Sequence, residues 1–297
     1  MPTAPRLHLV DGTYELFRAH YSPGPGRTDP SGANVKASVG LARSLLALLD
    51  DGDEHVTHIA VAFDHPIESF RNAQFAGYKS SAGVDEELLA QFDLAEEAVR
   101  AVGITVWPMD TVEADDALAT AAVLWREQTA QVRICTPDKD LAQVVDGRRI
   151  VQVDRARGRE IDEPAVRAKF GVGPRQIPDY LGLVGDAADG IPGIPGFGAK
   201  TAARLLDRYG HIDDIPLDTS WDIDIRGAER LQTTLRQRLD DAHLYRDLAR
   251  LRTDVELTES LQDLRFDGTD HGRFTDWCAH VGARTLAERP KRWRTPQ

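Results

Sequence analysis

Three short apolar runs along the chain each finish in an aspartate. They are LHLVD, ending at Asp11, HIAVAFD, ending at Asp64, and VRICTPD, ending at Asp138. Continuous apolar runs of this length are typical of strands buried in a parallel sheet. Because ligands of open α/β sheets bind beyond the carboxyl ends of such strands, we expect the three aspartates to converge on one edge of the sheet.

Segments with apolar residues at helical spacing separate these runs. They cover residues 34–50, 85–103 and 114–128, and the runs 103–108 and 148–154 are two further strand candidates. Strands that alternate with helices predict a parallel, three-layer α/β domain.

After about residue 160 the pattern changes to helical segments separated by glycine and proline. These segments are 163–171, 174–183, 199–210, 227–240 and 241–252. We therefore expect two domains, an α/β domain over residues 1–162 and a mainly helical lobe over residues 163–297.

The composition agrees with a folded soluble protein. Hydrophobic residues make up 41% of the 297 positions and charged residues 28%. No apolar run approaches the ~20 residues needed to cross a bilayer, and the N-terminus lacks the pattern of a signal peptide. Cys135 and Cys278 lie far apart, without disulfide or metal-ligand spacing. We expect a cytoplasmic protein that makes no membrane contact.

The formal net charge of -12 argues against a nucleic-acid partner, because duplex binding depends on neutralising phosphates with lysine and arginine. Carboxylates that surround divalent cations, however, count as negative in the sequence while metal neutralises them in the protein. Arginine supplies 30 of the 36 basic residues and concentrates in 148–159, 226–252 and the tail RPKRWR. Basic surface is therefore available for DNA.

The segment TVEADD places Glu113, Asp115 and Asp116 at the start of a predicted helix. Helix capping explains one or two acids in a first turn. Three acids within four positions repel one another unless a cation lies among them, so this motif favours metal binding.

Two further segments add acids. TPDKDL gives Asp138 and Asp140 just beyond a strand end, although DKD alone is equally typical of a solvated turn. GDAADG gives Asp186 and Asp189 three positions apart, which puts both carboxylates on one side of a helix or tight turn; a loop with Asx-type caps is the alternative. The nine predicted metal-site acids are Asp11, Asp64, Glu113, Asp115, Asp116, Asp138, Asp140, Asp186 and Asp189.

The kind and number of these acids predict the chemistry. Carboxylates without histidine or cysteine nearby favour Mg²⁺ or Mn²⁺ over zinc. Nine exceed what one such ion takes from protein but suit two ions about 4 Å apart, one activating water and the other stabilising the leaving oxygen of a phosphoryl group. Phosphodiester hydrolysis is therefore the expected reaction, and no Walker loop points to nucleoside triphosphate hydrolysis.

The string IPGIPGFGAKTAARLL predicts a tight turn followed by an amphipathic helix from about residue 199 to 209. Gly196 and Gly198 allow backbone amides to approach a ligand, while Phe197 between them anchors the turn in the core. The N-terminus of the helix, with Lys200, forms an anion site suited to a DNA phosphate without reading sequence. An ordinary helix-turn-helix connection is the alternative.

Several motifs together resemble those of the 5′-nuclease family, the flap endonucleases and the 5′-3′ exonuclease domain at the N-terminus of bacterial DNA polymerase I. In family order they are LVDG, AFD with SFR and GYK after it, EADD, TPDKDL and LVGDAADGIPGIPGFGAKTA, and the resemblance covers about residues 5–260. It implies a stand-alone PIN-like α/β nuclease domain with a helical arch at about 70–95. It also implies a helix-three-turn-helix at about 183–210 that grips duplex DNA and often holds a monovalent cation such as K⁺.

The resemblance also assigns roles to single residues. It implies two metal groups, one formed by the five acids up to Asp116 and one by the four from Asp138 on, and it makes Asp115 and Asp116 catalytic. Arg71 and Lys79 would stabilise the scissile phosphate where the arch meets the 5′ end. The positions expected to bind DNA are Tyr78, Gly193, Gly196, Gly198, Lys200 and Thr201.

One of these positions has a second interpretation, and two segments depart from the family pattern. Tyr78 would stack on a terminal base or else pack in the core. After GYK, relatives continue with two residues and then an arginine, whereas this chain has Ser80, Ser81 and Ala82, in an arch about one residue shorter. Gly190 replaces the usual asparagine.

The sequence thus predicts a monomeric, structure-selective 5′ nuclease that uses two Mg²⁺ or Mn²⁺ ions in replication or repair. Its expected substrate is DNA at the junction of a 5′ single strand and duplex, with RNA-primed DNA as a further candidate. Two alternatives are a non-catalytic module that binds DNA junctions and a Mg²⁺-dependent phosphatase that acts on small phosphoesters.

Overall fold

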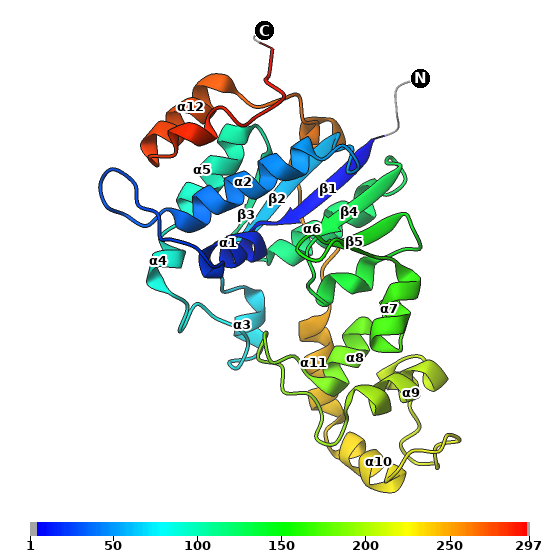
Figure 1. Cartoon of the computed structure of the whole chain (residues 1–297). Helices are drawn as coiled ribbons and strands as arrows, with labels where there is room; N and C mark the ends of the chain where they lie inside the picture. Colours follow the sequence, from blue (N-terminus) through cyan, green and yellow to red (C-terminus); the bar gives the residue numbers. More distant parts are fainter. Residues whose placement is uncertain (1–4, 296–297) are drawn as a thin grey trace. The chain divides into compact units, whose positions relative to one another are not determined.

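The computed structural model describes residues 5–295, which divide into two compact units. The first unit comprises the chain up to Ile67, Ser81–Thr136 and the residues from Thr253 on. The second comprises Glu68–Ser80 and Pro137–Arg252. Each unit is therefore assembled from segments that lie far apart in the sequence (Figure 1).

Four parallel strands form the sheet of the first unit. In spatial order they are β3 (Thr105–Met109), β2 (His58–Asp64), β1 (Arg6–Asp11) and β4 (Gln131–Cys135). Val10 lies opposite Val61 of β2 on one side and opposite Cys135 of β4 on the other. Every residue of β2 is buried, which is why its sequence is a continuous apolar run.

The first unit also contains helices. They are α1 (Gly12–Tyr21), α2 (Lys36–Asp50), α4 (Glu86–Leu89), α5 (Phe92–Val102), α6 (Ala114–Trp125) and α12 (His271–His280), with the 3-10 helices η4 (Leu261–Leu264) and η5 (Arg284–Leu286). Helix α2 packs against α1 and α5, and α6 contacts all four strands. The helix expected over 85–103 is two helices. Between them the side chain of Gln91 turns to the start of α2, where its Oε1 accepts a hydrogen bond from the Ala37 amide at 3.0 Å.

The C-terminal segment belongs to this unit, although the sequence pattern places it with the helical lobe. Helix α12 packs on α5, and Thr105 Oγ1 donates to the carbonyl of Asp263. The backbones of Arg265 and His58 form an isolated antiparallel β-bridge. These contacts join residues more than 150 positions apart, so local periodicity does not reveal them.

The second unit is mainly helical. It contains α3 (Phe70–Gln74), η1 (Asp140–Val144), β5 (Ile150–Asp154), β6 (Arg159–Ile161), α7 (Glu163–Phe170), η2 (Pro174–Gln176), α8 (Ile177–Val184), α9 (Ala199–Tyr209), η3 (Ile212–Asp214), α10 (Ala228–Gln237) and α11 (Leu239–Ala249). Strands β5 and β6 form an antiparallel pair. Helices α8 and α11 approach closely at Gly182, where a Cβ would lie 2.8 Å from the Arg246 nitrogen. Among the described residues, no helix has both the length and the apolar character needed to span a bilayer.

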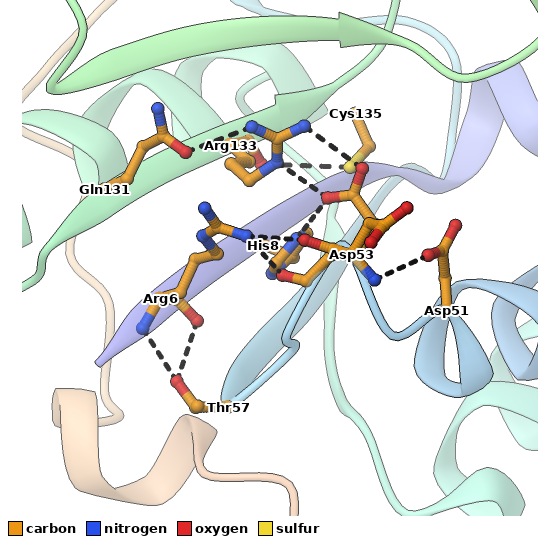
Figure 2. A network of polar contacts seen from close by, with 9 residues as sticks. Arg6, His8, Asp51, Asp53, Thr57, Gln131, Arg133 and Cys135 are labelled. Carbon is orange, nitrogen blue, oxygen red and sulfur yellow. Dashed lines mark hydrogen bonds and ion pairs between the residues drawn. The ribbon is translucent and has the colours of Figure 1, made fainter. Parts of the chain in front are cut away.

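A network of polar contacts connects the amino-terminal halves of β1 and β4 (Figure 2). The guanidinium of Arg133 binds both carboxylate oxygens of Glu54, at 2.7 and 3.1 Å, and His8 Nε2 lies 2.9 Å from Glu54 Oε2. Burial lowers the pKa of His8, so the neutral ring donates Nε2–H to the carboxylate. The hydrogen bonds from His8 and Arg133 hold the pKa of Glu54 down at about 2. This network lies at the edge of the sheet opposite Asp11 and Asp64.

Candidate metal centre and nucleic-acid interface

Asp11 and Asp64 end the neighbouring parallel strands β1 and β2, so both lie at the carboxyl edge of the sheet. Asp11 caps α1: its Oδ1 accepts from the Tyr14 amide at 2.8 Å and its Oδ2 from Thr136 Oγ1 at 3.0 Å. Asp64 Oδ1 accepts from the Ala114 amide at 2.7 Å. The start of α6 is therefore attached to the end of β2.

The acidic turn that precedes and begins α6 lies at this same edge. Asp116 is fully buried, and its Oδ2 accepts from the Glu113 amide at 3.1 Å. Glu113 is also buried, and Asp115 is half-buried. Glu113 and Asp116 form a capping box, because the Glu113 side chain in turn accepts from the Asp116 amide. Capping therefore accounts for two acids of the three.

A second group of acids lies in the second unit. Asp140 begins η1, whereas Asp186 and Asp189 follow α8. One carboxylate oxygen of each lies within 4.8 Å of the other two, and within residues 5–295 no other trio of metal-ligand side chains comes as close together. Asp140 and Asp186 are buried, and Oδ1 of Asp140 has no hydrogen-bond partner in the described part of the chain. We call Asp140, Asp186 and Asp189 the acid cluster.

The electrostatics of the acid cluster fit a divalent cation. Burial, together with the charges of Asp138, Asp189 and Asp186, raises the pKa of Asp140 well above its ordinary value. Burial also raises the pKa of Asp189. A buried carboxylate oxygen without a donor is costly, and a hard cation with oxygen ligands would satisfy it. The residues present therefore fit Mg²⁺ or Mn²⁺.

Two lysines border the acid cluster. Lys79 Nζ lies 3.6 Å from Asp189 Oδ1, and the Lys79 amide donates to the Asp189 carbonyl at 3.0 Å. The side-chain amide of Asn72 in α3 donates to the Lys79 carbonyl at 2.8 Å. Lys139 Nζ lies 2.5 Å from Asp186 Oδ2. The resemblance led to Lys79, but sequence reasoning did not select Lys139, although it stands between two predicted metal-site acids.

The charge of Lys139 is stabilised where it lies. Burial of the ammonium favours its neutral form, but the hydrogen bond to Asp186 and the charges of Asp186, Asp140 and Asp138 outweigh this effect and raise the pKa of Lys139. Asp138 itself lies beside the acid cluster, where its Oδ1 accepts from the Asp140 amide at 3.0 Å.

Arg71 and Tyr78 lie in the interior of the second unit. Arg71 is 1% exposed, and its guanidinium donates to the carbonyls of Leu248 and Arg250 at 2.8 and 2.9 Å. These bonds attach α3 to the end of α11. Tyr78 is 5% exposed and lies within the hydrophobic core. This is the position expected of a packed aromatic, the second of its two interpretations.

The turn before α9 and the first turn of α9 contain the other positions expected to contact DNA. Phe197 packs in the core, as predicted. Gly193 has a φ of +71°, and a Cβ there would lie 2.5 Å from the Gly185 nitrogen, so the tight turn requires glycine. A Cβ on Gly198 would meet nothing within 4 Å, so packing does not explain that glycine. Gly196 and Lys200 are exposed, and Thr201 is half-buried.

Steric crowding explains why position 190 is a glycine. Its φ is +73°, and a Cβ built there would lie 2.0 Å from the carbonyl oxygen of Gly77. This approach brings the segment that carries Lys79 next to Asp189. The glycine that replaces the usual asparagine at position 190 therefore permits the close backbone contact that places Lys79.

Comparison with known proteins gives the relatives of the chain. Residues 6–171 match the family described as 5′-3′ exonuclease, N-terminal resolvase-like domain, and residues 172–272 match 5′-3′ exonuclease, C-terminal SAM fold. DNA polymerase I of Rhizobium leguminosarum is 38% identical over 295 residues, which cover 97% of this chain and 28% of the relative. The thermostable DNA polymerase I of Thermus aquaticus is 35% identical over 258 residues, covering 85% and 29%. The chain thus spans less than a third of the length of these relatives.

Solved structures share the fold. A mutant of the T5 5′-exonuclease superposes with a TM-score of 0.61 at 18% identity, covering 96% of this chain and all of that one. A bacteriophage T5 flap endonuclease, in a complex with DNA and metal ions, gives 0.64 at 19% identity and covers 96% of both chains. The expected fold class is confirmed: a resolvase-like, PIN-like α/β domain is followed by a helical SAM-like part. Because the two family matches together span residues 6–272, the chain belongs to the 5′-3′ exonuclease family.

Proposed function

We propose that this protein is a divalent-metal-dependent, structure-selective 5′ nuclease that hydrolyses DNA phosphodiesters. The observation that carries the proposal is the acid cluster of the second unit. Three carboxylates converge there, one buried oxygen lacks a hydrogen-bond partner in the described chain, and the Lys79 ammonium lies 3.6 Å from Asp189. A phosphodiester that enters such a site meets both metal ligands and a cation for its charge.

The acids divide into two ligand sets in this proposal. Asp140, Asp186 and Asp189 hold one Mg²⁺ or Mn²⁺ ion, with Asp138 beside them. The five acids of the first unit, which include Asp115, hold a second. When bound, two such ions supply activation of water and stabilisation of the leaving oxygen.

The remaining residues position the substrate. Lys79 stabilises charge on the scissile phosphate, and Asp189 and Asn72 fix the location of Lys79. Arg71 acts through the anchorage of α3, which carries Asn72. The proposal retains the metal-site and catalytic assignments, but it gives Arg71 a positioning role.

The turn before α9 is the proposed grip on duplex DNA. The open backbone at Gly198 and the exposed Lys200 suit a backbone phosphate at a helix N-terminus. The bacteriophage T5 flap endonuclease that shares this fold was solved in a complex with DNA and metal ions, which supports the same ligands here. We further propose that the turn holds a K⁺ ion.

The proposed setting is that of a replication or repair enzyme. We propose a cytoplasmic monomer that acts on DNA with a 5′ single strand beside a duplex, and on RNA-primed DNA as a second substrate. Its membership of the 5′-3′ exonuclease family supports this substrate class.

The test is cleavage of a 5′-labelled flap in Mg²⁺ or Mn²⁺, with a chelator control. Asp189→Asn should lower the rate at least about 10²-fold, whereas the exposed Asp240→Asn in α11 removes the same charge away from the site and should leave it unchanged. Equal rates for wild type and Asp189→Asn would reject catalysis at this site. Tight junction binding without turnover or metal dependence would instead favour a non-catalytic module.

A product ladder from matched substrates defines the specificity. Flap, nicked and RNA-primed duplexes are cleaved in parallel. Release of intact flaps indicates endonuclease action, and release of single nucleotides indicates exonuclease action.

A further inference from the structure

The acid cluster already contains cations of the chain itself. Lys139 Nζ lies 2.5 Å from Asp186 Oδ2, and Lys79 Nζ lies 3.6 Å from Asp189 Oδ1. The third acid, Asp140, keeps one buried oxygen that no described donor reaches. The Lys139 ammonium therefore lies against one of the three carboxylates that a metal ion would use.

We propose that Lys139 is an internal counter-ion of the acid cluster, which holds the metal-free carboxylates together and competes with the divalent cation for Asp186. The proposal rests on the proposed metal site and deepens it, because it concerns how readily that site takes up its ion.

The two lysines differ in how firmly they are held. Lys79 is fixed by its backbone, because its amide donates to the Asp189 carbonyl and its carbonyl accepts from Asn72. Its side chain is also the less exposed of the two, at 23% against 33% for Lys139. For Lys139 the carbonyl accepts from the Ala142 amide, which fixes the main chain, but the long side chain is one-third exposed and can turn to solvent.

Electrostatics then determines the direction of the effect. Without metal, three close carboxylates repel one another, and the Lys139 ammonium reduces this repulsion. An ammonium and a divalent ion that both approach the Asp186 carboxylate repel each other at this range. The Lys139 charge therefore opposes entry of the metal ion, which weakens metal binding, while in the metal-free site it preserves the arrangement of the carboxylates.

The test measures Mn²⁺ binding to the full chain by calorimetry. The binding is measured in an Asp115→Asn background, which removes a ligand from the first unit. Lys139→Gln should bind Mn²⁺ about tenfold more tightly than the background protein, a change of about 1.4 kcal/mol. Lys139→Met should do the same, and Lys139→Arg, which keeps the charge, should stay within about twofold.

Lys291→Met is the matched control. Lys291 is exposed and lies 3.8 Å from Asp50 Oδ2 in the first unit, so this variant removes the same charge without touching Asp186. Its Mn²⁺ affinity should stay within about twofold of the background.

Thermal unfolding supplies a second measurement. Lys139→Gln should melt at a lower temperature without metal and gain more from saturating Mn²⁺ than the background does. A merely structural lysine would lower both melting temperatures equally and leave the affinity unchanged. That result, or weaker Mn²⁺ binding by Lys139→Gln and Lys139→Met, overturns the proposal. If the wild type binds no Mn²⁺, the proposed metal site fails together with it.

Discussion

The substitution Gly190→Ala tests whether a single close backbone contact holds Lys79 at the acid cluster. The backbone at this position has a φ of +73°, which costs a residue with a side chain about 1–2 kcal/mol. The new Cβ would also lie 2.0 Å from the Gly77 carbonyl oxygen, so the segment must move, at a further cost of about 1–3 kcal/mol. We therefore expect a loss of about 3 kcal/mol in the free energy of unfolding of the second unit.

Urea unfolding followed by circular dichroism measures this loss, and cleavage of a 5′-labelled flap measures its effect on the site. Because the displaced segment carries Lys79, cleavage should fall even under conditions where Gly190→Ala is fully folded. Gly198→Ala is the matched control, since its φ is -93° and its Cβ would meet nothing within 4 Å. Its stability should change by less than about 0.5 kcal/mol.

Asparagine separates the two costs. It tolerates positive φ but carries the same Cβ, so Gly190→Asn should recover only the smaller, conformational part of the loss. If Gly190→Ala unfolds like the wild type, the close contact with Gly77 does not constrain the protein, and the reasoning is refuted.

Three further predictions concern buried groups. Arg71→Met leaves the buried carbonyl of Leu248 and the partly buried carbonyl of Arg250 without this donor. It should destabilise the second unit by about 2–4 kcal/mol in urea unfolding, with Arg71→Lys losing less; equal stability of both variants and wild type would contradict this. Phe197→Ala removes a core ring and should cost about 3–5 kcal/mol by the same measurement, whereas an exposed ring would cost almost nothing. The pKa of Glu54 is about 2 in the folded protein against an ordinary 4.5, so its contribution to stability is present above pH 4.5 and is lost as the pH falls toward 2. Burial lowers the pKa of His8, so below pH 6.5 protonation of His8 in the unfolded chain also reduces stability. When the free energy of unfolding is measured against pH, Glu54→Gln should remove only the part of the pH dependence below pH 4.5. An unchanged pH dependence would contradict the assignment.

Much of the fold follows from local patterns. The apolar runs that end at Asp11 and Asp64 are strands with those ends, because a strand buried on both faces must be apolar throughout. The helices of the second unit also begin and end within a few residues of their predicted bounds, since glycine and proline interrupt them. The short helix α3 and the C-terminal helix α12 had no comparable signal.

The sequence by itself determined the nine acids, the order of the motifs and the glycine-rich turn, because residue type and spacing carry that information. Only the tertiary structure decided which acids form a close trio, that Lys139 pairs with Asp186, and that Arg71 lies inside rather than at the surface. It also assigned the C-terminal segment to the α/β unit. The physical reason is the same in each case: these are contacts between residues distant along the chain, and they depend on packing and charge that no local pattern contains.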